Sequence, residues 1–133
     1  MVEFHINRRS GIPAYVQLVL QVKQALRLGD LNPGDRLPTA KEVVEAVTVN
    51  PNTVLKAYRE LENDGLVQAR PGLGTFVTRS LSKPGMAERR ALQAEVTEWA
   101  RAAAAAGLDR SDLEALVAAA LDSEFGEDTG DFA

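Results

Sequence analysis

Hydrophobic positions in the first part of the chain change from a spacing of two residues to a helical spacing. Val2, Phe4 and Ile6 alternate with polar residues, which predicts a short strand or an extended arm. Between Pro13 and Gly29, hydrophobic residues recur at helical spacing: Tyr15, Leu18, Val19, Val22, Ala25 and Leu26. Because proline suits the first position of a helix and glycine suits its end, this pattern predicts a first helix.

Two further helices are predicted, each by a capping residue that precedes hydrophobic positions. Thr39 and Glu42 have the spacing of a capping box, in which the threonine accepts from a backbone N–H and the glutamate reaches back. The short second helix after them carries Val43, Val44 and Val47. Asn50 is a favoured N-cap and Pro51 a favoured first residue, so a third helix should begin there and end before Gly65. Its buried stripe should contain Val54, Ala57, Tyr58 and Leu61.

Strand-like segments follow the third helix. Residues 66–70 and 75–78 have strand character, and Pro71-Gly72-Leu73-Gly74 between them is typical of a tight turn, which predicts a β-hairpin. Three helices followed by a hairpin is the element order of a winged helix-turn-helix. The predicted fold class is therefore mainly α, with a winged helix-turn-helix domain at residues 1–80 and a short two-helix segment after it.

Residues 81–133 are expected to form that separate helical segment. Serine, proline and glycine in residues 80–85 indicate a linker. A hydrophobic stripe then predicts a fourth helix that stops near Gly107, and Asp109 is expected to cap a fifth helix. From Asp122 onward the sequence has five acidic residues and no basic one, and this tail is expected to fray into solvent.

The two helices of this segment are expected to need a partner. A unit of about fifty residues buries little apolar surface alone, and such units usually associate. A second copy of the chain is the expected partner, which makes residues 81–133 a dimerisation segment. The residues predicted to form the contact are Leu92, Val96, Trp99, Leu113, Leu116, Val117 and Leu121. Trp99 could instead be a stacking platform for a ligand, but its place on a hydrophobic stripe favours packing.

Composition limits the chemistry. The chain has 133 residues, 45% of them hydrophobic and 26% charged, with no cysteine and a single histidine, His5. Without cysteine no thiolate site can form, and one histidine in a predicted exposed strand favours neither a histidine metal site nor a Ser-His-Asp arrangement, so we expect no metal, no cofactor and no enzymatic activity. No hydrophobic run reaches the roughly 18 residues of a membrane span, and the cytoplasm is the expected location.

Charge divides the chain into two parts. The formal net charge is −4, but residues 1–80 hold ten Lys and Arg against eight Asp and Glu, whereas residues 81–133 hold five against eleven. The first part is only mildly basic. Binding of a polyanion by this part must therefore depend on where individual charges are placed.

The tip of the third helix is the main candidate for binding chemistry. In a helix-turn-helix, the first residues of the second helix of the motif meet base edges in the major groove. Asparagine can pair with adenine through two hydrogen bonds, and threonine offers a hydroxyl and a methyl group. Asn50, Asn52 and Thr53 are therefore predicted to read bases, and Lys56 to meet phosphate one turn later. The same residues would suit any capped surface helix, but a hairpin with Arg70 beside a glycine turn favours DNA.

Three stretches carry a family resemblance: residues 13–39, NPNTVLKAYRELENDGLV at residues 50–67 and RPGLGTFV at residues 70–77. They resemble the winged-helix domain of the GntR family of bacterial transcription regulators, and the short appendage resembles the YtrA subgroup. The resemblance implies a homodimer that binds operator DNA, usually as a repressor. It also implies DNA contacts from Arg36, Thr39, Lys41, Asn50, Asn52, Thr53, Lys56, Arg70 and Gly72.

The chain departs from the family pattern in the helix-turn-helix. Val44 stands where many members have a small residue, Thr48 where many have a glycine, and Lys41 where arginine is common. Because lysine cannot form the planar bidentate pair of arginine, Lys41 is expected to meet phosphate rather than a base. The resemblance implies effector control as well. Residues 81–133 are too few for the larger effector-binding domains of relatives, and the sequence does not decide whether a small molecule binds.

The sequence thus predicts a homodimeric, sequence-specific DNA-binding repressor that acts on a two-fold symmetric operator. The alternative, from a different class of protein, is a winged helix retained as a protein-interaction module that binds no specific DNA. Such a module would have no reason to keep a polar helix tip together with Lys56 and Arg70, which favours the DNA-binding regulator.

Overall fold

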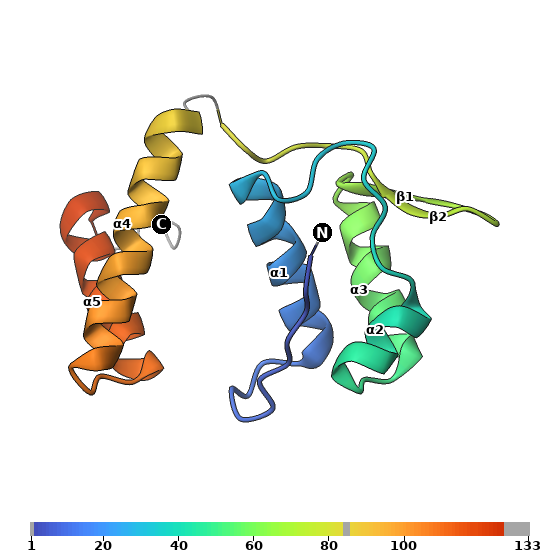
Figure 1. The fold of residues 1–133 in the computed structure, drawn as a ribbon. Helices are drawn as coiled ribbons and strands as arrows, with labels where there is room; N and C mark the ends of the chain where they lie inside the picture. Colours follow the sequence, from blue (N-terminus) through green and yellow to red (C-terminus); the bar gives the residue numbers. More distant parts are fainter. Residues whose placement is uncertain (1, 84–85, 127–133) are drawn as a thin grey trace. The chain divides into compact units, whose positions relative to one another are not determined.

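The computed structural model describes residues 2–83 and 86–126 of the chain (Figure 1). The chain divides into two compact units, one at residues 1–84 and the other at residues 85–133. Among the described residues, the first unit contains three helices and a two-stranded sheet, and the second contains two helices.

Three helices build the core of the first unit: α1 (Ala14–Leu28), α2 (Ala40–Val47) and α3 (Pro51–Asn63). In Figure 1, α3 lies beside both α1 and α2 and packs against each of them. All three helices contribute fully buried side chains, among them Leu18, Leu26, Val43 and Leu61. The three predicted helices are confirmed. Their hydrophobic stripes face one another in this core.

The helix ends have the predicted caps. α1 ends at Gly29, whose φ of 78° lies in the left-handed region that glycine adopts without strain. At the start of α2, Thr39 Oγ1 accepts from Glu42 N and the Glu42 carboxylate accepts from Thr39 N, both at 3.1 Å. This completes the predicted capping box. α3 begins with Asn50 as its N-cap and Pro51 as its first residue.

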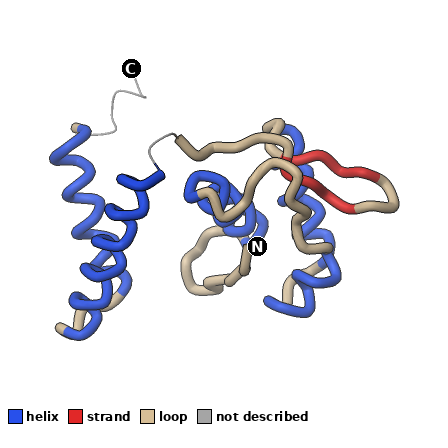
Figure 2. Tube along the Cα trace, turned by 45° about the horizontal axis from the view of Figure 1, so that its top comes forward, coloured by secondary structure: helices blue, strands red, loops and turns tan. Residues whose placement is uncertain are grey.

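A β-hairpin follows α3 and forms the wing, drawn in red in Figure 2. Its two strands are β1 (Val67–Arg70) and β2 (Gly74–Val77). They pair antiparallel, with Arg70 opposite Gly74. Residues 34–37 run along the other edge of β2, where Leu37 N donates to Thr75 O at 2.8 Å. The hairpin after three helices confirms the winged helix-turn-helix.

The N-terminal residues form an extended arm, which is one of the two predicted forms. Phe4 is buried in the core of the first unit, and Val2 and Ile6 pack against it. The alternation of hydrophobic and polar residues therefore arises because one side of the arm packs against the core. Its backbone bonds to side chains of α1 instead of to a neighbouring strand: Gln21 Oε1 accepts from His5 N at 3.0 Å. The strand alternative is wrong, because residues 2–6 are not part of the sheet.

The second unit is a pair of helices, α4 (Met86–Ala105) and α5 (Arg110–Phe125). Asp109 and Asp112 form a capping box at the start of α5, with both hydrogen bonds at 2.9 Å. The sequence predicted fraying from Asp122. This is wrong for residues 122–125, because α5 continues to Phe125. The rest of the acidic tail, residues 127–133, lies outside the described residues.

Candidate nucleic-acid interface

The tip of α3 is exposed and polar. Asn50 Oδ1 accepts a hydrogen bond from Asn52 N at 2.8 Å, so the Asn50 side chain serves as the helix cap. The Asn52 side chain is exposed and makes no hydrogen bond with the other described residues, and Thr53 is half-buried. Pairing with adenine uses both the oxygen and the NH2 of one amide. Of the two asparagines predicted to read bases, Asn52 is the one whose amide is free to do so.

A groove of about 510 Å³ lies between the wing and the start of α2. Four residues predicted to contact DNA line it: Arg36, Thr39, Arg70 and Gly72. Gly74 shapes the wall of the groove, because its φ is 127° and a Cβ there would lie 3.1 Å from Arg36 Cδ. The fold therefore brings the residues just before α2 and those of the wing into one site.

Two arginines border this groove. The Arg70 guanidinium lies over the Phe76 ring, with Cζ 4.9 Å from the ring centroid, a cation–π contact that holds it on the wing. Arg36 Nη2 lies 3.7 Å from Glu42 Oε1, and both side chains are about half exposed. Exposed ion pairs are weak and are screened by salt. A phosphate can therefore compete with Glu42 for Arg36.

The loop that carries Arg36 and Thr39 is held from two sides. The pKa of the Glu42 carboxyl is lowered, chiefly by the hydrogen bond from Thr39 N and further by the Thr39 side chain and Arg36. The carboxylate therefore stays ionised, which keeps the capping box closed. The Tyr58 hydroxyl of α3 donates to Pro38 O at 2.6 Å. Burial, together with the nearby Glu42, raises the pKa of Tyr58 well above its usual value.

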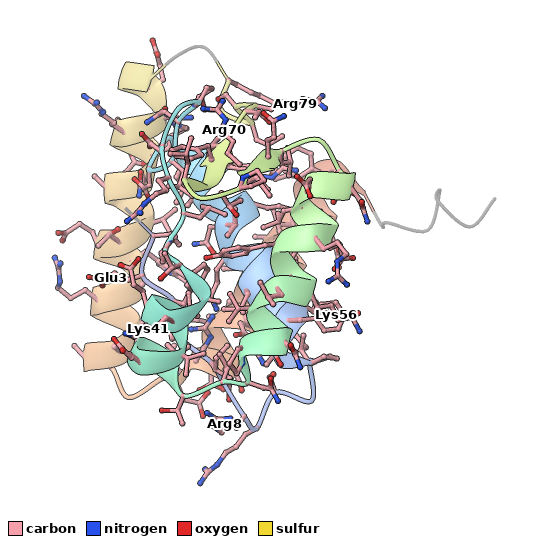
Figure 3. All side chains as sticks on the ribbon, turned by 90° about the vertical axis from the view of Figure 1, so that its right-hand side faces the viewer. Glu3, Arg8, Lys41, Lys56, Arg70 and Arg79 are labelled. Atoms are coloured by element: carbon pink, nitrogen blue, oxygen red, sulfur yellow. The ribbon has the colours of Figure 1, made fainter. Side chains whose placement is uncertain are left out.

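The two predicted lysines lie apart from the groove. Lys56 Nζ sits 4.0 Å from the centroid of the Tyr15 ring of α1. Figure 3 shows Lys41 on α2 and Lys56 on the opposite flank of α3. Both side chains are exposed. The two lysines place positive charge on either side of the pair formed by α2 and α3, and they do not form a cluster with each other.

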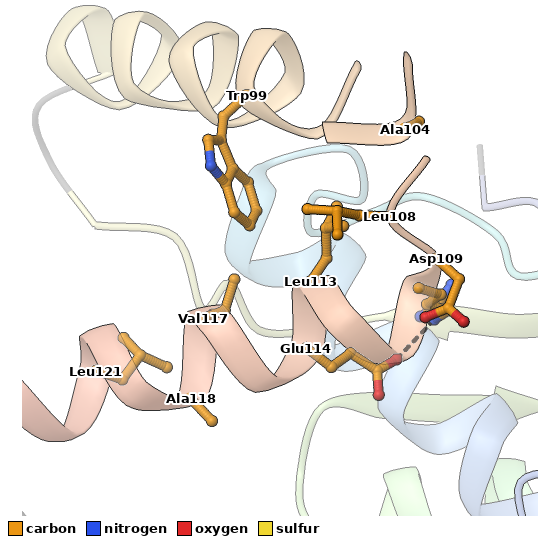
Figure 4. Close-up of a pocket in the computed structure, with 10 residues that line it drawn as sticks. Trp99, Ala104, Leu108, Asp109, Leu113, Glu114, Val117, Ala118 and Leu121 are labelled. Carbon is orange, nitrogen blue, oxygen red and sulfur yellow. Dashed lines mark hydrogen bonds and ion pairs between the residues drawn. The ribbon is translucent and has the colours of Figure 1, made fainter. Parts of the chain in front are cut away.

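The second unit carries the residues predicted to contact a second copy. A groove of about 640 Å³ between α4 and α5 is lined by Trp99, Leu113, Val117 and Leu121, among others (Figure 4). Large hydrophobic side chains remain exposed along both helices: Leu92, Val96, Trp99, Leu116, Val117 and Leu121. Ala103 is the one hydrophobic residue of this unit that is buried among the side chains described there. Both helices thus show an apolar face without an internal core to cover it.

Neither a metal cluster nor a membrane-spanning helix is present in the described residues. Within residues 2–83 and 86–126, no group of three or more histidines and carboxylates is placed to hold a metal ion. His5 is exposed on the arm. None of the helices in the described parts of the chain combines the length and hydropathy needed to cross a bilayer.

Comparison with known proteins decides the family. The family profile described as bacterial regulatory proteins, gntR family, matches residues 14–77, from the start of α1 to the end of the wing. The HTH-type transcriptional regulator Rv1152 of Mycobacterium tuberculosis is 39% identical over 107 residues, which cover 80% of this chain and 84% of Rv1152. This chain belongs to the GntR family. Because 107 residues exceed the length of the first unit, the match to Rv1152 extends into the second.

A second relative of this GntR chain supports the predicted subgroup. The HTH-type transcriptional repressor YtrA of Bacillus subtilis is 40% identical over 75 residues, which cover 56% of this chain and 58% of YtrA. The match thus spans little more than half of that repressor. Together with Rv1152 it confirms the YtrA-like resemblance, and the names of both relatives are those of transcriptional regulators and not of enzymes.

Solved structures agree on the fold of the GntR chain. A transcriptional antiterminator from Listeria monocytogenes EGD-e matches it with a TM-score of 0.54 and 28% identity, over 95% of this chain and 91% of that one. The DNA-binding domain of AraR, solved in complex with operator ORR3, matches with a TM-score of 0.50 and 25% identity, over 59% of this chain and 95% of that one. The second structure shows a related domain together with DNA.

The sequence patterns missed the supporting contacts that three residues make near the candidate interface. Tyr15 belongs to the hydrophobic stripe of α1, and its ring also lies under the Lys56 ammonium. Phe76 supports Arg70, and here the hairpin register was a usable signal, because Phe76 lies opposite Gln68 and so shares a face with Arg70. Arg8 bonds to Val47 and Thr48, 39 and 40 residues away, and nothing in its own segment indicates that contact.

Proposed function

We propose that this GntR regulator binds operator DNA with sequence preference and acts as a repressor, with the tip of α3 in the major groove. The observation that carries the proposal is the free, exposed amide of Asn52 at the start of a helix whose cap is already supplied by Asn50. One good bidentate contact of this kind discriminates between bases by about 1–3 kcal/mol. The operator complex of the AraR domain and the repressor named YtrA support the same role.

Phosphate contacts complete the proposed binding mode. Arg36 and Arg70 reach phosphates from the groove beside the wing, and Lys41 and Lys56 reach them from either flank of the helix pair. Gly72, with a φ of 76° and open space where a Cβ would be, leaves the wing backbone bare for a close approach to DNA. Because residues 1–80 are only mildly basic, a large share of the affinity rests on these few cations.

The proposed functional form is a homodimer through residues 81–133. Several large leucines and valines are exposed on both α4 and α5, and monomeric proteins seldom leave this much apolar surface in water. A second copy is the occupant that fits the function, because two reading helices related by a two-fold axis match an operator with inverted symmetry. The groove between α4 and α5 belongs to this contact, and no effector is assigned to it. The regulator needs no cofactor and works in the cytoplasm of a bacterium.

Selection of bound duplexes from a random pool, with sequencing, tests the proposal on the full-length protein. We expect one two-fold symmetric site, bound roughly 10³-fold or more tightly than a scrambled duplex of equal length. Footprinting should protect both halves of that site. A protein that binds the selected and scrambled duplexes equally would instead be the winged-helix interaction module, and a site without inverted symmetry would contradict the dimer.

A further inference from the structure

Arg8 of the N-terminal arm reaches the turn between α2 and α3. Its Nη2 donates to Thr48 O at 2.7 Å and to Val47 O at 3.3 Å. These carbonyls end α2, and Asn50 caps α3 two residues later. Figure 3 shows Arg8 at the end of the helix pair where this turn lies. The arm is therefore bonded to the residues that set where α3 begins.

The turn has two features that a cation can stabilise. Thr48 has a φ of 52° and is the one residue other than glycine with a positive φ among the described residues, so its backbone is in a region that side chains disfavour. The carbonyl end of a helix carries a partial negative charge that favours a cation nearby. α2 has no basic residue in its own last turn. Arg8 supplies that charge from a distant segment.

The arm that carries Arg8 is anchored on both sides of it. On one side, Phe4 is buried in the core. The buried Gln17 side chain holds residues before and after Arg8, and its Oε1 accepts from Asn7 N at 2.8 Å. Gln17 Nε2 also lies within hydrogen-bonding distance of three oxygens of the arm, namely Asn7 O, Ser10 Oγ and Ile12 O. Arg8 thus projects from a fixed support, which lets it hold the turn in place.

We infer that Arg8 is a positioning residue, which holds the turn in the conformation that aims α3 at the base edges. Without Arg8, Thr48 can relax out of the left-handed region, and the direction of Asn52 changes with it. The cations of the wing groove stay where they are. Loss of Arg8 should therefore weaken binding to the preferred site more than binding to DNA in general, and this consequence rests on the proposed function.

Arg8→Ala in the full-length protein tests this inference against Arg9→Ala. Arg9 is the neighbouring exposed arginine, and its side chain has no partner among the described residues, so both variants lose the same charge from the same arm. The affinity for the preferred duplex should fall about tenfold more in Arg8→Ala than in Arg9→Ala, as expected for loss of a charged hydrogen-bond donor. Affinity for a scrambled duplex and the salt slope should match between the two. Arg8→Lys should recover part of the loss, because an ammonium can still donate to Thr48 O.

Two outcomes of these measurements would overturn the inference. Equal losses in Arg8→Ala and Arg9→Ala would show that the bonds to the turn do not matter for recognition. A salt slope lower by about 0.9 in Arg8→Ala alone, with both duplexes weakened equally, would show that Arg8 contacts phosphate instead.

Hydrogen exchange without DNA separates this inference from the proposed function. Thr48 N donates to Val44 O at 3.0 Å, and this amide should exchange faster in Arg8→Ala than in Arg9→Ala. Amides of α1 should exchange alike in both variants, which shows that the fold is intact. Equal exchange at Thr48 would refute the inference even if the wild-type protein selects an operator. A wild-type protein that selects no sequence would refute the proposed function, and the Thr48 amide would still report whether Arg8 holds the turn.

Discussion

The two units of this GntR regulator differ in what their hydrophobic helix positions contact. In the first unit the stripes of three helices face one another, and Leu18, Val54 and Leu61 have no exposed surface. In the second unit, Leu92 and Val96 lie four residues apart on α4, and each remains 60% exposed. An amphipathic pattern therefore predicts a helix and its apolar face, but it does not show whether the partner of that face belongs to the same chain.

The same two parts differ in charge. Residues 1–80 carry an excess of two basic residues over acidic ones, whereas residues 81–133 carry an excess of six acidic residues. The mildly basic part has a complete core and a free polar helix tip, and the acidic part has an uncovered apolar face. This division suits one unit to DNA and the other to a protein surface.

Removing a core side chain should separate the units most clearly. Leu61→Ala leaves a cavity in the first unit and should cost about 2–5 kcal/mol of its free energy of unfolding. Leu92→Ala in the second unit, at a concentration low enough for monomer, should cost about 0.5 kcal/mol or less, because the side chain is exposed there. Hydrogen exchange of slow amides in each unit measures both values. Similar costs at the two positions would contradict the contrast in core formation.

A charge among the exposed apolar residues of α5 should dissociate the proposed homodimer. Val117→Lys places an ammonium in the proposed contact of both copies and should cost about 3 kcal/mol or more, roughly 100-fold in the dissociation constant. Ala119→Lys adds the same charge at an exposed position on another side of α5 and should change dimerisation little. Sedimentation over a range of concentrations compares the two variants. A Val117→Lys dimer as tight as the wild type would place the interface elsewhere.

Replacing one arginine in each unit by alanine tests whether the first unit alone contacts DNA. Arg70→Ala removes a proposed phosphate contact and should lower the slope of log affinity against log salt by about 0.9 per subunit contact. Arg101→Ala removes an arginine that pairs with Glu98 at 2.8 Å in the second unit, and the salt slope should stay the same. Binding isotherms at several salt concentrations give both slopes. Equal slopes for the two variants would remove Arg70 from the DNA contact.

The smallest effect should come from the capping box of α2. The pKa of Glu42 is lowered in the folded protein, so its contribution to stability is complete above the unfolded pKa, about 4.3, and is lost as the pH falls through the folded value. Glu42→Gln keeps an acceptor for Thr39 N but removes the titration. Thermal melts below pH 5 should therefore show a slightly steeper loss of stability in the wild type. Parallel curves would mean that the ionised carboxylate adds nothing to the cap.

The parts of this structure that the sequence predicted are those with local causes. Thr39 and Glu42 meet across one helical turn, and Asn50 with Pro51 starts α3, so both caps could be recognised from spacing alone. The hairpin followed from a glycine turn between strand-like segments. In these cases the interacting groups are within a few residues of each other, and the backbone permits few arrangements between them.

What the sequence could not predict depends on distant partners. Leu81, assigned to the linker, packs against the core of the first unit, and Lys56 meets the ring of Tyr15. The division of roles between Asn50 and Asn52 required the hydrogen bond that uses one amide as the cap. Arg8 is the clearest example, because its bonds to the turn before α3 join segments whose proximity is set by the packing of the whole unit.

The most direct test of the account concerns Asn52. Asn52→Ala, compared with Asn63→Ala at the exposed far end of the same helix, should be passed through selection from random duplexes and then measured on the preferred and scrambled sites. We predict a loss of about 1–3 kcal/mol on the preferred site, with relaxed preference at one position of each half-site. Binding to the scrambled duplex should be unchanged, and Asn63→Ala should behave as the wild type. An Asn52→Ala protein that selects the same operator with full preference at every position would contradict the claim that this helix tip reads DNA.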